Sequence, residues 1–193
     1  MTWPVTRTRV AYENPWIVVR EDVVVRPDGS PGVYGVVEVR RPAVFVVALT
    51  DADEVVLVTV DRHTVGTSIE VPAGGTDGEV PLVAARRVLA EETGLAAGTW
   101  RRVGEVTALN GICRAPEVVY LATDLRAVDG GDGGGDVTSD DADRSGDQVA
   151  EGISAVSRVP VAEALAMIRR GEITDGETVA ALMLALLELD RVR

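Results

Sequence analysis

The chain has 193 residues, 46% of them hydrophobic, and a formal net charge of −12. This length and apolar content predict one good core, and the acidic balance argues against a nucleic-acid partner bound through a basic face. An acidic protein can still take an anionic phosphate substrate if a divalent cation bridges the two.

The sequence contains no apolar run long enough to cross a membrane and no charged-then-apolar leader after Met1. Its single cysteine, Cys113, rules out an internal disulfide and fits a reducing compartment. No base is placed to activate that thiol, so it is not a predicted nucleophile. We therefore expect a cytoplasmic protein with no membrane partner.

A valine-rich segment from Thr6 to Arg41 is interrupted by the turn signal R-P-D-G-S-P-G. It predicts two or more β-strands, Trp16–Arg26 and Val33–Arg40. We assign residues 1–41 to a small N-terminal β-sheet and residues 42–193 to the remaining domain.

Two buried strands, Ala43–Leu49 and Glu54–Val60, are predicted around the turn Thr50–Asp53. The second strand runs into Arg62, whose guanidinium is well built to fork onto phosphate or carboxylate. A solvated arginine at a strand end is the alternative. The only histidine, His63, is given no role.

A proline- and glycine-rich turn after Glu70 leads into a predicted helix, Pro81–Thr93, which Gly94 ends. One face of this helix is apolar and should meet a core: Leu82, Ala85 and Leu89. Another face joins residues three and four positions apart: Val88, Glu91 and Glu92. Adjacent carboxylates above a glycine turn suit a hard cation such as Mg2+, although a solvated acidic helix end has the same pattern.

The order of residues in this stretch resembles the Nudix box, G-x(5)-E-x(7)-R-E-U-x-E-E-x-G-U, in which U is a bulky aliphatic residue. The matching positions are Glu79, Arg87, Leu89, Glu91, Glu92, Gly94 and Leu95. Two positions depart from the pattern, because its glycine falls on Ala73 and the glutamate after the box arginine is Val88. In the family that glutamate helps to hold the catalytic metal, so the resemblance implies a Nudix protein with an altered metal site.

The resemblance also implies roles for the box residues. Mg2+ or Mn2+ would be held by Glu91, Glu92 and the carbonyl of Ala73, with Glu92 counted among the catalytic residues. Glu79 would pair with Arg87 and brace the helix against the turn, so both belong to the predicted catalytic set.

Two more strands are predicted after the box, Trp100–Thr107 and Pro116–Thr123, because apolar residues alternate in both segments. The link between them takes the place of the family's substrate loop. The resemblance assigns substrate binding to Glu117, at the end of this link, and to Arg62 and Glu70.

Residues 129–150 form an acidic, glycine-rich loop. Nine Asp or Glu and two Arg lie between Asp124 and Glu151, a net charge of −7, which leaves −5 for the rest of the chain. Such a composition cannot bury enough surface to offset chain entropy, and it predicts a mobile loop.

The C-terminal part predicts a strand, Ile153–Val159, and a helix, Val161–Arg170, that a glycine ends. Thr174 and Glu177 then have the spacing of a capping box for a last helix. Because this helix is apolar on most sides, we expect it to be deeply packed.

The tail sequence V-P-V-A-E-A-L-A-M-I-R-R-G-E-I-T-D-G-E-T and the N-terminal segment N-P-W-I-V-V-R resemble the ADP-ribose pyrophosphatase branch of the Nudix family. In that branch the N-terminal sheet helps to form a homodimer; a plain hairpin packed on its own domain is the alternative here. The branch also carries a general-base glutamate in the loop before the last strand. Glu151 is the best match and Asp147 the second, the alternative being that both are solvated loop acids.

The resemblance implies an α/β fold, a Nudix α/β/α sandwich with a mixed sheet and a small N-terminal antiparallel sheet. It also implies a Mg2+-dependent pyrophosphohydrolase acting on a nucleoside diphosphate linked to another group, such as ADP-ribose or a nucleotide sugar. The alternative is a non-catalytic Nudix domain that binds a nucleotide as a sensor or partner subunit. Val88 favours the alternative, and the preserved Glu79, Arg87, Glu91 and Glu92 favour the enzyme.

Overall fold

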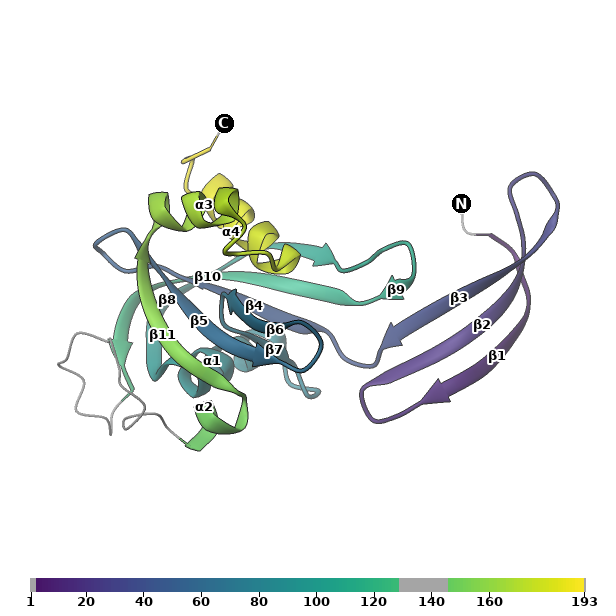
Figure 1. The fold of residues 1–193 in the computed structure, drawn as a ribbon, viewed down its shortest axis with the longest axis horizontal. Coiled ribbons are helices and arrows are strands. Elements are labelled where there is room, and N and C mark those ends of the chain that lie inside the picture. The colour runs from purple at the N-terminus through teal and green to yellow at the C-terminus, as the bar shows by residue number, and fades with distance from the viewer. Residues whose placement is uncertain (1–2, 129–145, 193) are drawn as a thin grey trace. The chain divides into compact units, whose positions relative to one another are not determined.

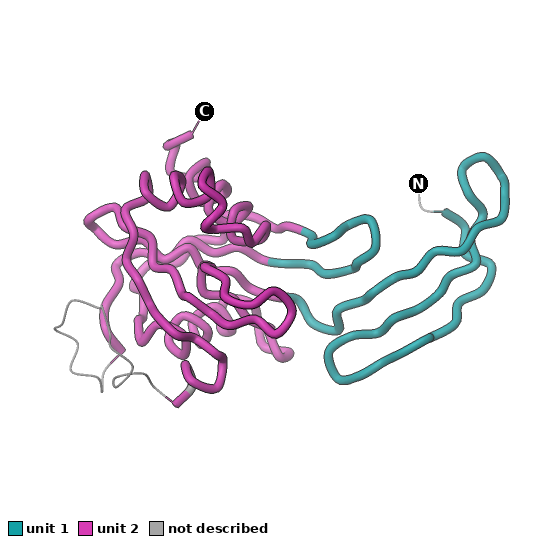
Figure 2. The backbone as a smooth tube through the Cα atoms, viewed as in Figure 1, with its two compact units in different colours: residues 1–42, 107–117 teal, residues 43–106, 118–193 magenta. Residues whose placement is uncertain are grey.

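The computed structural model describes residues 3–128 and 146–192. The chain forms two compact units, shown in Figure 2: Met1–Pro42 with Thr107–Glu117, and Ala43–Val106 with Val118–Arg193. The predicted mobile loop lies mostly outside the described residues. No helix in the described part of the chain is long and apolar enough to cross a membrane.

The first unit is a four-stranded sheet in the order β1-β2-β3-β9. Its strands are β1 (Val5–Glu13), β2 (Ile17–Val25), β3 (Pro31–Val39) and β9 (Cys113–Arg114). The first three pair antiparallel, as a valine-rich hairpin sequence predicts, and β9 joins β3 in parallel. Every residue of the edge strand β1 is exposed.

The second unit contains two sheets. One has the order β7-β4-β10-β8, from Ala73–Gly75, Ala43–Ala48, Pro116–Ala127 and Leu95–Thr107. The other has the order β11-β5-β6 and is antiparallel throughout, from Ile153–Pro160, Glu54–Arg62 and Gly66–Glu70.

Alternate residues of β4 face opposite layers of helices, as the period of two in a strand requires. Phe45 and Val47 lie in a buried cluster with residues of α3 (Val161–Arg170) and α4 (Gly176–Glu188). Val44 and Val46 lie in a second cluster with residues of α1 (Pro81–Thr93). Helices therefore cover both faces, which confirms the predicted α/β/α sandwich (Figure 1).

The bounds of α1 and α3 are those that the sequence predicts. Gly94 and Gly171 follow these helices with φ of 68° and 74°, the left-handed conformation that glycine adopts without steric cost.

The predicted cap of the last helix is wrong. Asp175, and not Thr174, is the N-cap of α4, because its carboxylate accepts a hydrogen bond from the backbone N–H of Thr178. The expected deep packing of this helix is also only half correct. Leu182 and Leu186 are buried, but residues one position further, such as Met183 and Leu187, are exposed on the outer face.

Candidate active site

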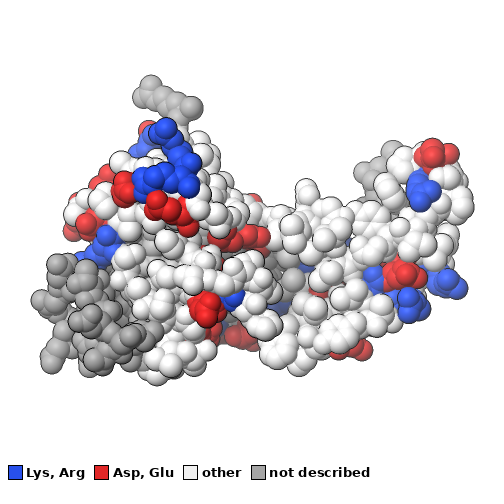
Figure 3. Space-filling view, viewed as in Figure 1, with Lys and Arg blue, Asp and Glu red and all other residues white. Residues whose placement is uncertain are grey.

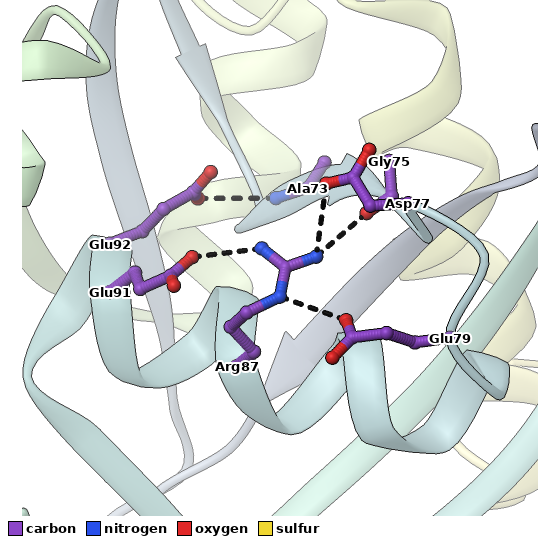
Figure 4. A network of polar contacts seen from close by, with 7 residues as sticks. All are labelled: Ala73, Gly75, Asp77, Glu79, Arg87, Glu91 and Glu92. Atoms are coloured by element: carbon purple, nitrogen blue, oxygen red, sulfur yellow. Dashed lines mark hydrogen bonds and ion pairs between the residues drawn. The ribbon is translucent and has the colours of Figure 1, made fainter.

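Two residues of the short strand β7, Ala73 and Gly75, are held by side chains of α1 (Figure 4). The N–H of Ala73 donates to Oε2 of Glu92 at 3.2 Å, and the carbonyl of Gly75 accepts from Nη2 of Arg87 at 3.0 Å. Between them lies Gly74, where an added Cβ would be 2.9 Å from Cγ2 of Val88. The glycine turn is therefore fixed against the helix by two hydrogen bonds, and the space beside Gly74 is too small for a Cβ against Val88.

Arg87 is the centre of a charged network on this face of α1. Its Nε donates to Glu79 and its Nη1 to Glu91, each at 2.9 Å, and Asp77 lies 3.5 Å from Nη2. The predicted brace between Glu79 and Arg87 is thus present in the structure. One carboxylate oxygen of Glu91 therefore accepts a hydrogen bond from the same arginine.

Glu92 differs from Glu91 in its burial. Its residue is only 8% exposed, and burial raises the pKa of its carboxyl to about 8. The Ala73 N–H and the charge of Arg62 act in the opposite direction, whereas the charges of Glu151 and Glu70 raise the pKa further. These charges interact with Glu92 because all four side chains approach the same region.

Arg62 and Glu70 form a two-point ion pair across the β5–β6 hairpin. Nε of Arg62 donates to Oε1 of Glu70 at 3.2 Å, and Nη2 donates to Oε2 at 2.6 Å. Glu70 is buried, whereas Arg62 is partly exposed. Arg62 is therefore held in one orientation by a buried carboxylate and is not a freely solvated strand-end arginine.

A short helix, α2 (Gly146–Ala150), attaches the residues before Glu151 to the end of α1. The side-chain amide of Gln148 donates to the backbone carbonyl of Glu92 at 2.9 Å. Glu151 itself is exposed, and its charge acts on Glu92. The side chain of Asp147, the second predicted base, lies outside the described residues.

Two protein-family models match the chain. The model of the NUDIX domain family matches residues 39–182. The chain belongs to the Nudix family. A second family model, the nucleoside diphosphate sugar hydrolase N-terminal domain, matches residues 3–37.

Two individual relatives extend the comparison. The chain is 34% identical over 168 residues to the ADP-ribose pyrophosphatase of Mycobacterium tuberculosis, covering 86% of this chain and 74% of that protein. Its fold is similar to the crystal structure of an ADP compounds hydrolase, with a TM-score of 0.77, 19% identity, and coverage of 100% and 98%. At that identity the structural likeness shows the Nudix fold, and the family and the first relative show a Nudix-type hydrolase.

Val88 is the position at which this Nudix box departs most from the family pattern. It is 3% exposed and belongs to the buried cluster that joins α1 to β4. Here a valine fills the space beneath the glycine turn, where the box pattern has a carboxylate. The position contributes packing to this chain and no oxygen ligand.

Among the described residues, no group of three or more His, Cys, Asp or Glu side chains forms a metal site. The donors near the turn still suit Mg2+, which is often bound through one or two carboxylates plus substrate phosphates. Glu92 in particular fits a cation, because a buried carboxylate that holds its proton up to pH 8 is stabilised in its ionised form by a positive charge.

Glu117 is buried and belongs to the first compact unit, with the predicted substrate loop. Within that unit the loop is attached to β3, because the N–H of Val37 donates to the carbonyl of Ile112. Cys113 is half-buried.

Sequence reasoning missed two features of the site. Neither the role of Gln148 nor the contact between Gly74 and Val88 is visible in local patterns, because each joins segments distant in the chain. The short strands β6 and β7 were also missed, and the two glycines of β7 weaken its strand signal.

Proposed function

We propose that this Nudix hydrolase is a divalent-metal-dependent pyrophosphohydrolase of nucleoside diphosphates linked to another group, with ADP-ribose or a nucleotide sugar as substrate. The observation that carries the proposal is the convergence of charged groups around Glu92. The charges of Arg62, Glu70 and Glu151 act on its carboxyl group, which also accepts a hydrogen bond from the Ala73 N–H of the glycine turn. The names of the relatives support the substrate class, and the N-terminal family match supports a nucleotide sugar.

Mg2+ or Mn2+ would be held by Glu92, Glu91 and the carbonyl of Ala73. When bound, the cation would offset the charge that develops on the bridging phosphates. Arg87 and Glu79 would hold α1 against β7, so that the carboxylates and the carbonyl keep their relative positions.

The reaction would break one bridging P–O bond of the diphosphate and form one bond from phosphorus to a water oxygen. Glu151 would accept the proton of that water as general base. Arg62, oriented by Glu70, would direct its remaining N–H groups to a substrate phosphate. The products would be a nucleoside monophosphate and the phosphorylated second group, with Glu117 a further candidate substrate contact.

A second candidate function is nucleotide binding without turnover, and the buried Val88 favours it. One experiment separates the two candidates: a hydrolysis screen over ADP-ribose, nucleotide sugars and dinucleotides, each with Mg2+ and with Mn2+. We expect turnover that Glu92→Gln lowers by about 10²-fold or more, the usual scale for a lost charged catalytic group. Glu163→Gln, on the exposed side of α3, is the matched control and should leave turnover unchanged.

Saturable nucleotide binding without hydrolysis of any compound would favour the second candidate. Turnover that Glu92→Gln leaves intact would remove Glu92 from the proposed site.

We also propose a homodimer formed through the N-terminal sheet. The edge strand β1 exposes Val10 and Tyr12, and Trp16 beyond it is 72% exposed. Unpaired edges with apolar side chains favour pairing with another strand. We expect light scattering at micromolar concentration to give a dimer mass, and Val10→Lys with Tyr12→Lys to give a monomer. Met183→Lys, an exposed apolar site in the other unit, is the control; a monomer mass for the natural chain would contradict the proposal.

A further inference from the structure

A pocket of about 390 Å3 opens on the second unit, apart from the box carboxylates. Its lining comes from α1, β8 and β10: Arg86, Ala96, Ala97, Gly98, Trp100 and Arg126. At 3.6 residues per turn, Arg86 points about 100° away from Arg87 around α1, and further from Glu91 and Glu92. The volume lies in the range of small-molecule sites.

The two arginines of this pocket are exposed, and neither forms an ion pair with any residue that the structure describes. Other arginines of the described chain do pair with acidic side chains. Over α3, for example, acidic and basic side chains gather on the face drawn in Figure 3, and Arg170 pairs there with Glu163 and Glu172. Two guanidinium groups at one pocket, with no ion-pair partner among the described residues, suit the two charges of a phosphate monoester.

The side of the pocket formed by Trp100 suits a planar apolar group. The indole N–H of Trp100 donates to the carbonyl of Ala97 at 3.1 Å, so the ring has no donor left and offers carbon surface. Its position is fixed by an edge-on contact with Tyr120, with ring centroids 6.3 Å apart. Asp124, beside Gly98, accepts a hydrogen bond from Thr99 and makes no ion pair with either pocket arginine.

We propose that the pocket of Arg86, Trp100 and Arg126 binds a nucleoside monophosphate, with the phosphate on the arginines and the base against the indole. Base stacking on an aromatic ring tolerates different bases, so the phosphate and a planar base define the ligand class. This is also the class of product that the proposed hydrolysis releases, and only that link rests on the proposed function.

The test is a fluorescence titration with adenosine monophosphate in EDTA, where metal-dependent binding at the box is absent. Trp3 and Trp16 are first replaced by phenylalanine, which leaves Trp100 as the only one of the three tryptophans. We expect a saturable change in emission, and a Kd raised about 10-fold or more in the double variant Arg86→Gln/Arg126→Gln, the scale for lost hydrogen bonds to a charged group. The double variant Arg158→Gln/Arg169→Gln removes two exposed arginines elsewhere and should keep the natural Kd.

Two further variants and ligands separate the outcomes. Arg62→Gln should leave the Kd unchanged; a Kd that moves with Arg62 and not with Arg86 and Arg126 would place the nucleotide at the box and overturn the proposal. Inorganic phosphate that binds as tightly as the nucleotide would overturn the role of the indole, and absence of binding by calorimetry would overturn the site itself. Because no turnover is measured, a failed hydrolysis screen leaves this result unaffected.

Discussion

Gly74→Ala tests how tightly the glycine turn is fixed to the box helix. The new Cβ would lie 2.9 Å from Cγ2 of Val88, well inside the about 3.5–4.0 Å at which two carbon atoms attract. Val88 is buried and β-branched, so it cannot rotate away without disturbing the cluster around it. We therefore expect the free energy of unfolding to fall by about 1–3 kcal/mol, the range for an overpacked core.

The companion variant Val88→Ala removes the atom that the new methyl would meet. Alone it deletes two buried methyl groups, at about 0.8 kcal/mol each, plus the cost of the cavity. Combined with Gly74→Ala it also removes the steric conflict, so the double variant should be no less stable than Val88→Ala. The coupling between the two sites is then about 1–3 kcal/mol, equal to the conflict that Gly74→Ala creates by itself.

The assay is urea unfolding followed by the fluorescence of Trp100, with Trp3 and Trp16 replaced by phenylalanine. Gly75→Ala is a close control, because its added Cβ would be 3.5 Å from Asp77, an ordinary contact. If Gly74→Ala is as stable as Gly75→Ala, or if its effect simply adds to that of Val88→Ala, the packing of Val88 against the turn is not as described. The rate of hydrolysis should also be lower in Gly74→Ala than in Gly75→Ala, since displacement of Gly74 also moves Ala73 away from Glu92.

Three further predictions concern the same face. Val88→Glu buries a carboxylate beside Glu92 that a cation can use, so it should lower the Tm in EDTA but enlarge the rise in Tm that Mn2+ produces. Scanning fluorimetry measures both quantities. An unchanged response to Mn2+ would show that residue 88 does not lie at the metal. Without metal, the raised pKa of Glu92 means that the folded protein keeps a proton between pH 4.5 and about 8 that the unfolded chain releases. Its contribution to the free energy of unfolding should thus be full below pH 4.5 and lost by about pH 8, and urea unfolding of Glu92→Gln against pH should lack that loss. Gln148→Leu should lower kcat in steady-state assays by less than the about 10²-fold expected for Glu151→Gln, and an equal or larger effect would give Gln148 more than a positioning role.

The regular elements of this fold were predictable because their signals are local. The helix Pro81–Thr93 begins with proline and ends before Gly94, and both residues act through their own backbone preferences. The same local rule failed at the last helix, where Thr174 and Asp175 both have capping side chains and the backbone position of Asp175 decided between them. A spacing rule cannot distinguish two adjacent caps.

The metal face was predictable only in part, for a different physical reason. The pairing of Glu79 with Arg87 follows from a family pattern in one continuous segment. The orientation of Arg62 by Glu70 and the bond from Gln148 to Glu92 depend on which strands and helices pack together. Such contacts leave no periodic trace in a single sequence, so the sequence alone left the state of Arg62 open.

Glu92 links more elements than the box pattern assigns to it. Its carboxylate meets β7 at Ala73, its backbone carbonyl meets α2 at Gln148, and its charge is balanced against Arg62 on β5. With valine at position 88, the helix keeps a single buried carboxylate at the turn, because Glu91 is half-exposed and shared with Arg87. A site that depends on one buried carboxylate should respond steeply to any change that moves Glu92. Gly74→Ala acts on it through the turn and Gln148→Leu through the helix end, so the two changes should lower turnover without removing a charged group.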